Sequence, residues 1–114
     1  MAYAVKQDLI DRFGAQEIIQ RTDRTNRPAS TIDDTVVERA IADAEALLDG
    51  YLARAYDLPL AQVPPVLTKI TCDIARLNLW AGAADKDGPV QRAADAGIAW
   101  VKDVARGLVR IDVG

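Results

Sequence analysis

The longest stretch of helical periodicity in the sequence lies between Val36 and Tyr56. Apolar residues recur there at spacings of three and four for about five turns, which is the pattern of one buried face of an α-helix. Charged residues such as Glu38 and Asp43 occupy the opposite face. An amphipathic helix of this length must bury its apolar stripe against other elements. The chain is therefore expected to be all-α, a small helical bundle.

Glycine and proline divide the remaining chain into further helical segments. We predict short N-terminal helices within residues 1–20, a long helix over 33–56, and helices over 65–84 and 89–107, all in one domain spanning 1–114. These are about four main helices. The polar residues 21–31 predict a mobile loop, whose candidate residues are Arg24, Asn26, Arg27 and Pro28.

The ends and faces of these helices follow from residue type. Asp33 is a suitable N-cap for the long helix, and Pro65 is suited to the first position of the next one. The apolar stripe of the helix over 65–84 is expected to comprise Leu67, Ile70, Ile74, Leu77 and Ala81. Its opposite, polar face is expected to carry Lys69, Asp73 and Arg76. Gly97 lies in the apolar stripe of the last helix, where it would permit close approach of another helix.

The C-terminal residues 108–114 follow a different pattern. Leu108, Val109, Ile111 and Val113 alternate with Arg110 and Asp112 after Gly107. Such alternation favours an extended segment, either a short strand or a docking arm.

Charge and cysteine content exclude several classes of protein. The 114 residues carry a net charge of −3 with no dense basic block, whereas tight binding to a nucleic-acid backbone needs a surplus of lysine and arginine. An acidic wall would instead let passing DNA slide. We predict no membrane span and no secretory signal, because no apolar run is long enough and the N-terminus is charged. The single cysteine forbids an internal disulfide and suits a reducing compartment.

The residues offer no catalytic constellation. Histidine is absent and Ser30 is the only serine, so neither a hydrolytic triad nor a histidine metal site is expected. Cys72 is interpreted as a core residue. The pairs Asp33-Asp34 and Asp85-Asp87 are interpreted as helix-end or turn residues rather than metal ligands. We predict that the chain is not an enzyme and has no cofactor.

The two tryptophans have two interpretations. Trp80 and Trp100 lie at the edges of the predicted apolar stripes. Either they cap the hydrophobic core, or they anchor a contact between subunits, since tryptophan is enriched at interface hot spots. The candidate interface residues are therefore Trp80, Trp100, Leu108, Val109, Arg110, Ile111 and Val113.

Three segments resemble a known family. They are YAVKQDLIDRFGAQEIIQRTDR, IDDTVVERAIADAEALLDGYLARAYDLPL and VPPVLTKITCDIARLNLW. Together they cover Tyr3 to Trp80 and resemble the gene product 36 family of Mu-like phages, in order and with similar spacing. Val5 departs from the family pattern, which has threonine near this position.

The family is similar to the helical head–tail connector proteins of long-tailed phages. The resemblance implies a subunit that docks on the portal protein, forms a ring with its own copies, dodecameric like the portal, and presents a surface to a stopper or tail-terminator protein. Its place would be the neck of the virion, after assembly in the host cytoplasm, with genomic DNA passing through without sequence-specific binding. The alternatives are another neck or tail-completion protein and a helix-turn-helix regulator built around Gly14, against which the acidic charge counts.

Overall fold

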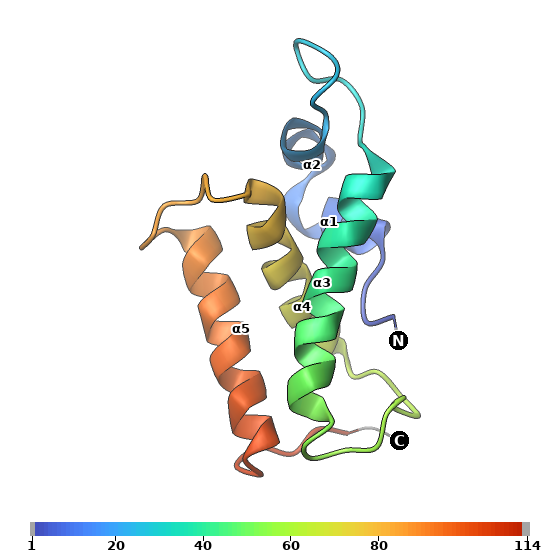
Figure 1. The fold of residues 1–114 in the computed structure, drawn as a ribbon, viewed down its shortest axis with the longest axis vertical. Helices are drawn as coiled ribbons and strands as arrows, with labels where there is room; N and C mark the ends of the chain where they lie inside the picture. The colour runs from blue at the N-terminus through green and yellow to red at the C-terminus, as the bar shows by residue number, and fades with distance from the viewer. Residues whose placement is uncertain (1, 113–114) are drawn as a thin grey trace.

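The computed structural model describes residues 2–112, and within that range it contains five helices and no β-strand (Figure 1). In chain order they are α1 (Lys6–Phe13), α2 (Ala15–Thr22), α3 (Asp34–Leu52), α4 (Pro65–Trp80) and α5 (Pro89–Ala105). The molecule measures 47 × 30 × 19 Å along its principal axes. The predicted all-α helical bundle is confirmed.

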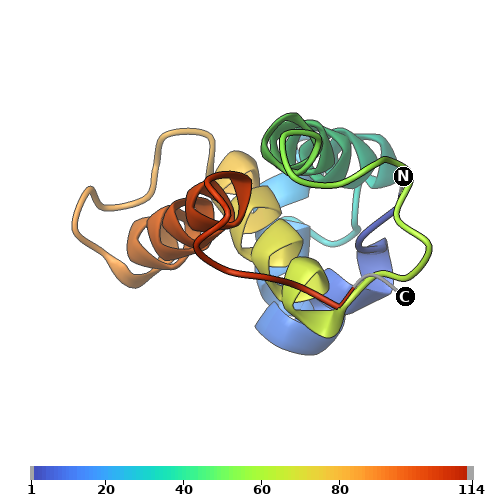
Figure 2. The same ribbon diagram turned by 90° about the horizontal axis from the view of Figure 1, so that it is seen from below.

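Helix α4 lies in the middle of the molecule and contacts the other four helices (Figures 1 and 2). Residues 70–75 are all buried, which is more than one complete helical turn. Asp73 was expected on the polar face of this helix, and its side chain is paired with Lys69 Nζ at 2.7 Å but is buried there. The apolar periodicity indicated one buried face only, because the second buried face of α4 includes the polar residues Thr71 and Asp73.

The N-terminal region folds as two short helices that meet at Gly14. This glycine has a φ of 89° and ends α1, with its amide donating to the Ile10 carbonyl. Leu9 of α1 and Ile18 of α2 are fully buried in the common core. Val5 caps α1 without a side-chain hydrogen bond, but the Asp8 carboxylate accepts the Val5 amide at 2.8 Å.

Helix α3 begins as predicted and ends earlier than predicted. The Asp33 carboxylate accepts hydrogen bonds from the amides of Thr35 and Val36, which confirms the N-cap. The helix ends at Leu52 rather than at residue 56, because residues 53–56 form a tight turn. In that turn the Tyr51 and Leu52 carbonyls accept from amides three residues later.

Helices α4 and α5 both begin with a proline, as predicted for Pro65. Helix α4 ends at Trp80 rather than at residue 84, because Ala81 and Gly82 adopt positive φ angles of 49° and 87°. Ala81 is consequently exposed and is not part of the apolar stripe.

Helix α5 packs closely on α4 and is followed by a non-helical tail. A Cβ atom at Gly97 would lie 2.9 Å from Ile70 Cγ2, which confirms the close approach predicted there. Helix α5 ends at Ala105, two residues before the predicted end at 107. The chain then crosses the lower end of the molecule (Figures 1 and 2).

The tail forms no strand over residues 108–112, so that alternative was wrong for the described part. No neighbouring strand is present there to pair with it. Its backbone is held instead by a hydrogen bond from the Ile111 amide to Tyr56 Oη at 3.0 Å. Val113 lies outside the described residues.

Candidate functional site

Residues 2–112 contain few groups with the chemistry of a catalytic or metal site. These residues contain no group of three or more Cys, Asp and Glu side chains placed to hold a metal ion. No helix in this range is both long and apolar enough to cross a bilayer. Cys72 is fully buried, and burial raises the pKa of its thiol to about 11. The thiolate is the reactive form of cysteine, so this thiol is inert near neutral pH.

Trp80 belongs to a cluster that joins α2 to the C-terminal half of α4. Its ring lies under the guanidinium of Arg21, whose Cζ is 3.8 Å from the ring centroid. The indole N–H donates to Glu17 Oε2 at 3.5 Å. Trp80 is thus half-buried, and its contacts are with Arg21 and Glu17 of its own chain. Its role in a contact with another subunit stays a prediction.

Glu17 lies at the centre of this cluster. Its two carboxylate oxygens accept hydrogen bonds from Arg76 Nε and Nη2 at 2.8 and 2.7 Å, and the Arg76 guanidinium also lies over the Phe13 ring. Burial alone would raise the pKa of Glu17, but the hydrogen bonds and charge of Arg76 outweigh it, and the net shift is downward. The same hydrogen bonds raise the pKa of Arg76. The pair is ionised and fixes α2 on α4.

A second cluster holds the N-terminal segment against α3. The backbone amides of Tyr3 and Ala4 donate to Glu45 Oε2, and the Tyr3 hydroxyl donates to Asp49. Burial, with the neighbouring Asp49 carboxylate, raises the pKa of Tyr3 above its usual range. The Tyr3 carbonyl accepts from Thr68 Oγ1 at 2.7 Å, which connects the segment to α4 as well.

Sequence reasoning missed both clusters. The bonded residues are 41 to 65 positions apart in the chain. In sequence their charged members have the spacing of ordinary solvent-exposed helix positions. The only local signal is that Glu17 and Arg21, like Arg76 and Trp80, are four residues apart and share a helix face.

The candidate interface residues do not gather into one site. Trp80 ends α4 at the upper end of the molecule, whereas the tail crosses the lower end (Figure 1). Trp100, Val109 and Ile111 are half-buried against the core. Leu108 and Arg110 are exposed, and Leu108 at 69% is the most exposed of the large apolar residues described.

The loop predicted to be mobile is organised around Asp23. Its two carboxylate oxygens accept hydrogen bonds from four backbone amides, those of Thr25, Asn26, Ser30 and Thr31. These bonds, foremost the one from Ser30, lower the pKa of Asp23 far below its ordinary value. Arg24, Asn26, Arg27 and Pro28 are all exposed at the tip. Movement of this loop stays a prediction.

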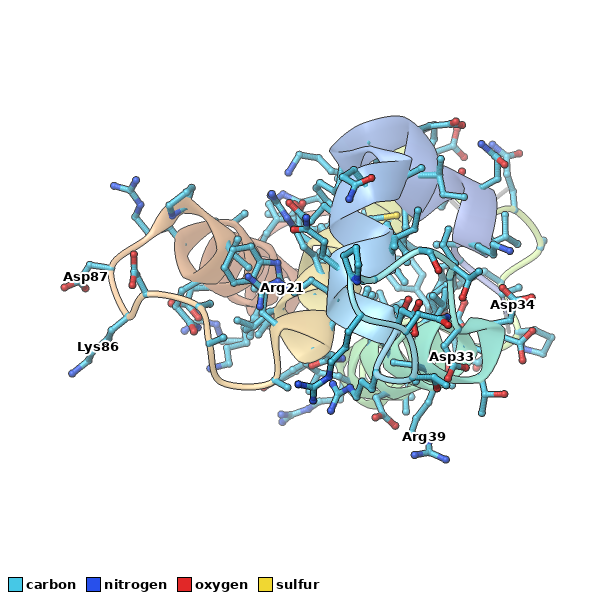
Figure 3. The ribbon with its side chains drawn as sticks, turned by 90° about the horizontal axis from the view of Figure 1, so that it is seen from above. Arg21, Asp33, Asp34, Arg39, Lys86 and Asp87 are labelled. Atoms are coloured by element: carbon cyan, nitrogen blue, oxygen red, sulfur yellow. The ribbon has the colours of Figure 1, made fainter. Side chains whose placement is uncertain are left out.

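The upper end of the molecule presents charges of both signs. Figure 3 shows Lys86 and Asp87 pointing outward from the α4–α5 connection, with Asp33, Asp34 and Arg39 at the opposite edge around the start of α3. At the lower end, a groove of about 410 Å³ between α3 and α5 is lined by Tyr51 and by the cations Arg54, Lys102 and Arg106, among others. Neither region resembles a catalytic cleft.

Taken together, the fold and its surfaces define a small all-helical bundle whose distinctive exposed features are an apolar tail residue and charged helix ends. Residues 3–114 match the model of the family described as "Bacteriophage Mu, Gp36", so the chain belongs to that phage protein family. The match extends the resemblance predicted for Tyr3 to Trp80 to the end of the chain.

Two relatives support this membership. The protein named "Gene product J" of Escherichia phage Mu is 41% identical over 78 residues, which cover 66% of this chain and 52% of that protein. The "Mu-like prophage FluMu protein gp36" of Haemophilus influenzae is 36% identical over 77 residues, which cover 68% of this chain and 53% of that protein. The match therefore spans about half the length of each relative.

Proposed function

We propose that this chain is a structural subunit of the phage virion, a head–tail connector (adaptor) that docks on the portal protein and is not an enzyme. Copies form a ring, dodecameric like the portal, and the ring presents a surface to a stopper or tail-terminator protein. The subunit assembles in the host cytoplasm and ends in the neck of the particle.

The observation that carries the proposal is the C-terminal tail of a phage-family helical bundle. Leu108 is exposed at 69%, while Val109 and Ile111 pack on the core and the Ile111 amide is bonded to Tyr56. We infer that this tail, with one exposed and two half-buried apolar side chains in sequence, forms part of a contact surface. The net charge of −3 supports a role beside DNA without tight binding to it.

Two alternatives predict different partners. Another neck or tail-completion protein would share the fold and bind a tail component instead of the portal. A helix-turn-helix regulator would use α1 and α2, but the only cation of α2 is Arg21, which lies over Trp80. No basic recognition face is left for DNA.

The test is size-exclusion chromatography with light scattering, on the protein alone and mixed with the portal protein of the same phage. Co-elution with the portal ring is the expected result. A protein that ignores the portal and binds a tail component contradicts the adaptor role in favour of tail completion. A protein that ignores the portal but shifts a DNA fragment at moderate salt contradicts it in favour of a regulator.

A further inference from the structure

The most exposed apolar side chain is held by the helix that precedes it. The Leu108 amide donates to the Asp103 carbonyl at 2.9 Å and the Gly107 amide donates to the Val104 carbonyl at 3.0 Å. Gly107 has a φ of 78°, which turns the chain out of α5. Leu108 therefore projects from a fixed position at the end of α5.

Two arginines flank this leucine. Arg106 and Arg110 are both exposed, and Arg110 has no ion pair within residues 2–112. Arg106 is paired with Asp103 at the surface, with side chains 66% and 38% exposed. Exposed pairs of this kind contribute little to stability, so Arg106 can exchange its partner. We call Arg106, Leu108 and Arg110 the tail knob.

A groove of matching character lies between the N-terminal segment and α3. It has a volume of about 370 Å³ and is lined by Ala4, Val5, Lys6, Glu38, Ile41 and Glu45. Ala4, Val5 and Ile41 are its apolar part, and Val5 is 56% exposed. We call this the α3 groove.

The rim of the α3 groove is negative. Glu38 is exposed and has no ion pair within the described residues. Glu45 is half-buried, and its Oε2 accepts the amides of Tyr3 and Ala4. It forms none of the ion pairs found within residues 2–112. Lys6, the one cation of the groove, is paired with Asp34 at 2.6 Å. An apolar groove with two carboxylates at its edge complements an apolar knob with two guanidiniums.

The knob begins at the end of α5, whereas the α3 groove lies beside the N-terminal segment. Helix α5 and the N-terminal segment are on opposite sides of the molecule, and the tail leaves α5 across the lower end (Figures 1 and 2). We propose that a second copy of this chain supplies the missing half: Leu108 of one copy occupies the α3 groove of the next, with Arg106 and Arg110 opposite Glu38 and Glu45. A contact between two different surfaces repeats head to tail, and it gives a ring where the rotation between successive copies closes. The inference rests on the proposed function and names the surface that joins adjacent adaptor subunits.

The first test exchanges charges across the contact. Glu38→Lys and Arg110→Glu are each expected to raise the dissociation constant between copies at least about 10-fold, because like charges facing each other oppose association. The double variant restores opposite charges and is expected to recover assembly. Lys102→Glu is the matched control, an exposed cation of α5 outside the knob. Sedimentation velocity at low salt, with and without the portal protein of the same phage, measures the effect.

The second test traps the contact covalently. A Val5→Cys/Leu108→Cys chain, oxidised with copper–phenanthroline, is expected to give a ladder of disulfide-linked oligomers. Both positions are exposed, and the natural Cys72 is buried and does not compete. A mixture of the two single-cysteine chains is expected to give linked dimers and nothing longer. Ala96→Cys/Leu108→Cys, with an exposed position on α5 instead, is expected to give no ladder.

The outcomes separate this contact from the adaptor role. Rings that form on the portal without a 5–108 link overturn the contact and leave the adaptor role standing. A ladder from a protein that does not bind the portal supports the contact and contradicts the adaptor role. The contact is overturned if no disulfide ladder forms either with or without the portal protein. It is also overturned if the double charge variant assembles no more tightly than the single variants.

Discussion

Glu17 shows how one side chain fixes the position of a short helix. Helix α2 has only eight residues, too few to be stable alone. The Glu17 carboxylate accepts two hydrogen bonds from Arg76 of α4. Arg21, one turn further along α2, lies over the Trp80 ring. The energetic consequence depends on pH, because the pKa of Glu17 is lower in the folded protein than its ordinary value of 4.5. A depressed pKa means that the charged form stabilises the fold above the ordinary value, and that this contribution is lost as pH falls through the folded pKa.

Glu17→Gln is expected to lower the free energy of unfolding by about 1.5–3 kcal/mol at neutral pH, the range for hydrogen bonds to charged groups. The difference from the natural protein should stay constant above pH 4.5 and shrink at lower pH. Urea unfolding across this pH range measures it. Glu38→Gln, at an exposed glutamate without an ion pair, is the control and should change stability by less than about 0.5 kcal/mol. A difference between Glu17→Gln and the natural protein that grows as pH falls would contradict the assignment.

Thr71 presents the opposite case, a polar atom that gains nothing from burial. Its Oγ1 is the one buried side-chain nitrogen or oxygen without a hydrogen-bond partner in residues 2–112. Thr71→Val keeps the shape and removes the hydroxyl, so we expect the protein to become more stable by about 1 kcal/mol. Thermal unfolding measures this, and Thr68→Val is the contrasting variant, because Thr68 Oγ1 donates to the Tyr3 carbonyl. A Thr71→Val protein less stable than the natural one would reveal an undetected partner of the hydroxyl.

Among the elements, the packing of α5 on α4 depends on a missing side chain. A Cβ at Gly97 would lie 2.9 Å from Ile70 Cγ2. Ile70 is itself only 3% exposed, so its side chain has little room to move away. Gly97→Ala gains about 1 kcal/mol of helix propensity, but overpacking costs about 1–3 kcal/mol. We therefore expect a net loss of stability of about 1 kcal/mol.

A double-mutant cycle tests the cause. Ile70→Ala opens space at this contact, so Gly97→Ala should be less harmful in the Ile70→Ala background than in the natural one. Chemical denaturation of the four proteins gives the coupling free energy. Strict additivity of the two substitutions would place the strain elsewhere. Gly50→Ala, at an exposed glycine of α3 with no atom near the added Cβ, is the matched control and should stabilise the protein.

The elements also show which parts of the fold are visible in the sequence. Helix starts were predictable, because Asp33, Pro65 and Pro89 act on their own neighbours. The ends of α3 and α4 were each predicted four residues too late, because residues 53–56 turn without a glycine and Ala81 adopts a left-handed conformation that its residue type does not favour. The end of α5 was predicted two residues too late, at Gly107.

The burial of polar residues and the groove of the candidate contact were not predictable from the sequence, whereas the exposed tail residue was. The burial of Asp73 depends on α4 being surrounded by other helices, and periodicity within one segment does not record this. The exposed Leu108 was identified as an interface candidate from its place in the tail. The α3 groove was not, because Val5 and Ile41 come together only in the folded chain.

For the whole molecule, the tail packs partly on the bundle and partly presents a surface for contact with another subunit. Residues 108–112 pack the half-buried side chains of Val109 and Ile111 on the bundle, and the Leu108 and Ile111 amides donate to Asp103 and Tyr56. The Leu108 side chain points outward. Deletion of residues 108–114 is therefore expected to leave a folded monomer, with α1 to α5 intact and stability lowered by about 1–3 kcal/mol from lost apolar burial. Assembly on the portal should be lost, because the deleted chain lacks Leu108 and Arg110, which are proposed to join each copy to the α3 groove of the next.

Two further variants separate the causes of that loss. Tyr56→Phe removes the acceptor of the Ile111 amide but keeps the tail sequence, so it should weaken portal binding less than the deletion does. Leu108→Ser keeps the anchors and removes only the exposed apolar side chain, so its monomer should be as stable as the natural one. Circular dichroism reports the fold, and co-sedimentation with the portal ring reports binding. If the deleted protein is folded and still binds the portal normally, the tail has no part in docking, and the charged upper end of the bundle becomes the surface to mutate next. If the deletion and Leu108→Ser both abolish ring assembly while Tyr56→Phe only weakens it, assembly depends on the leucine itself, and the anchors act by holding it in place.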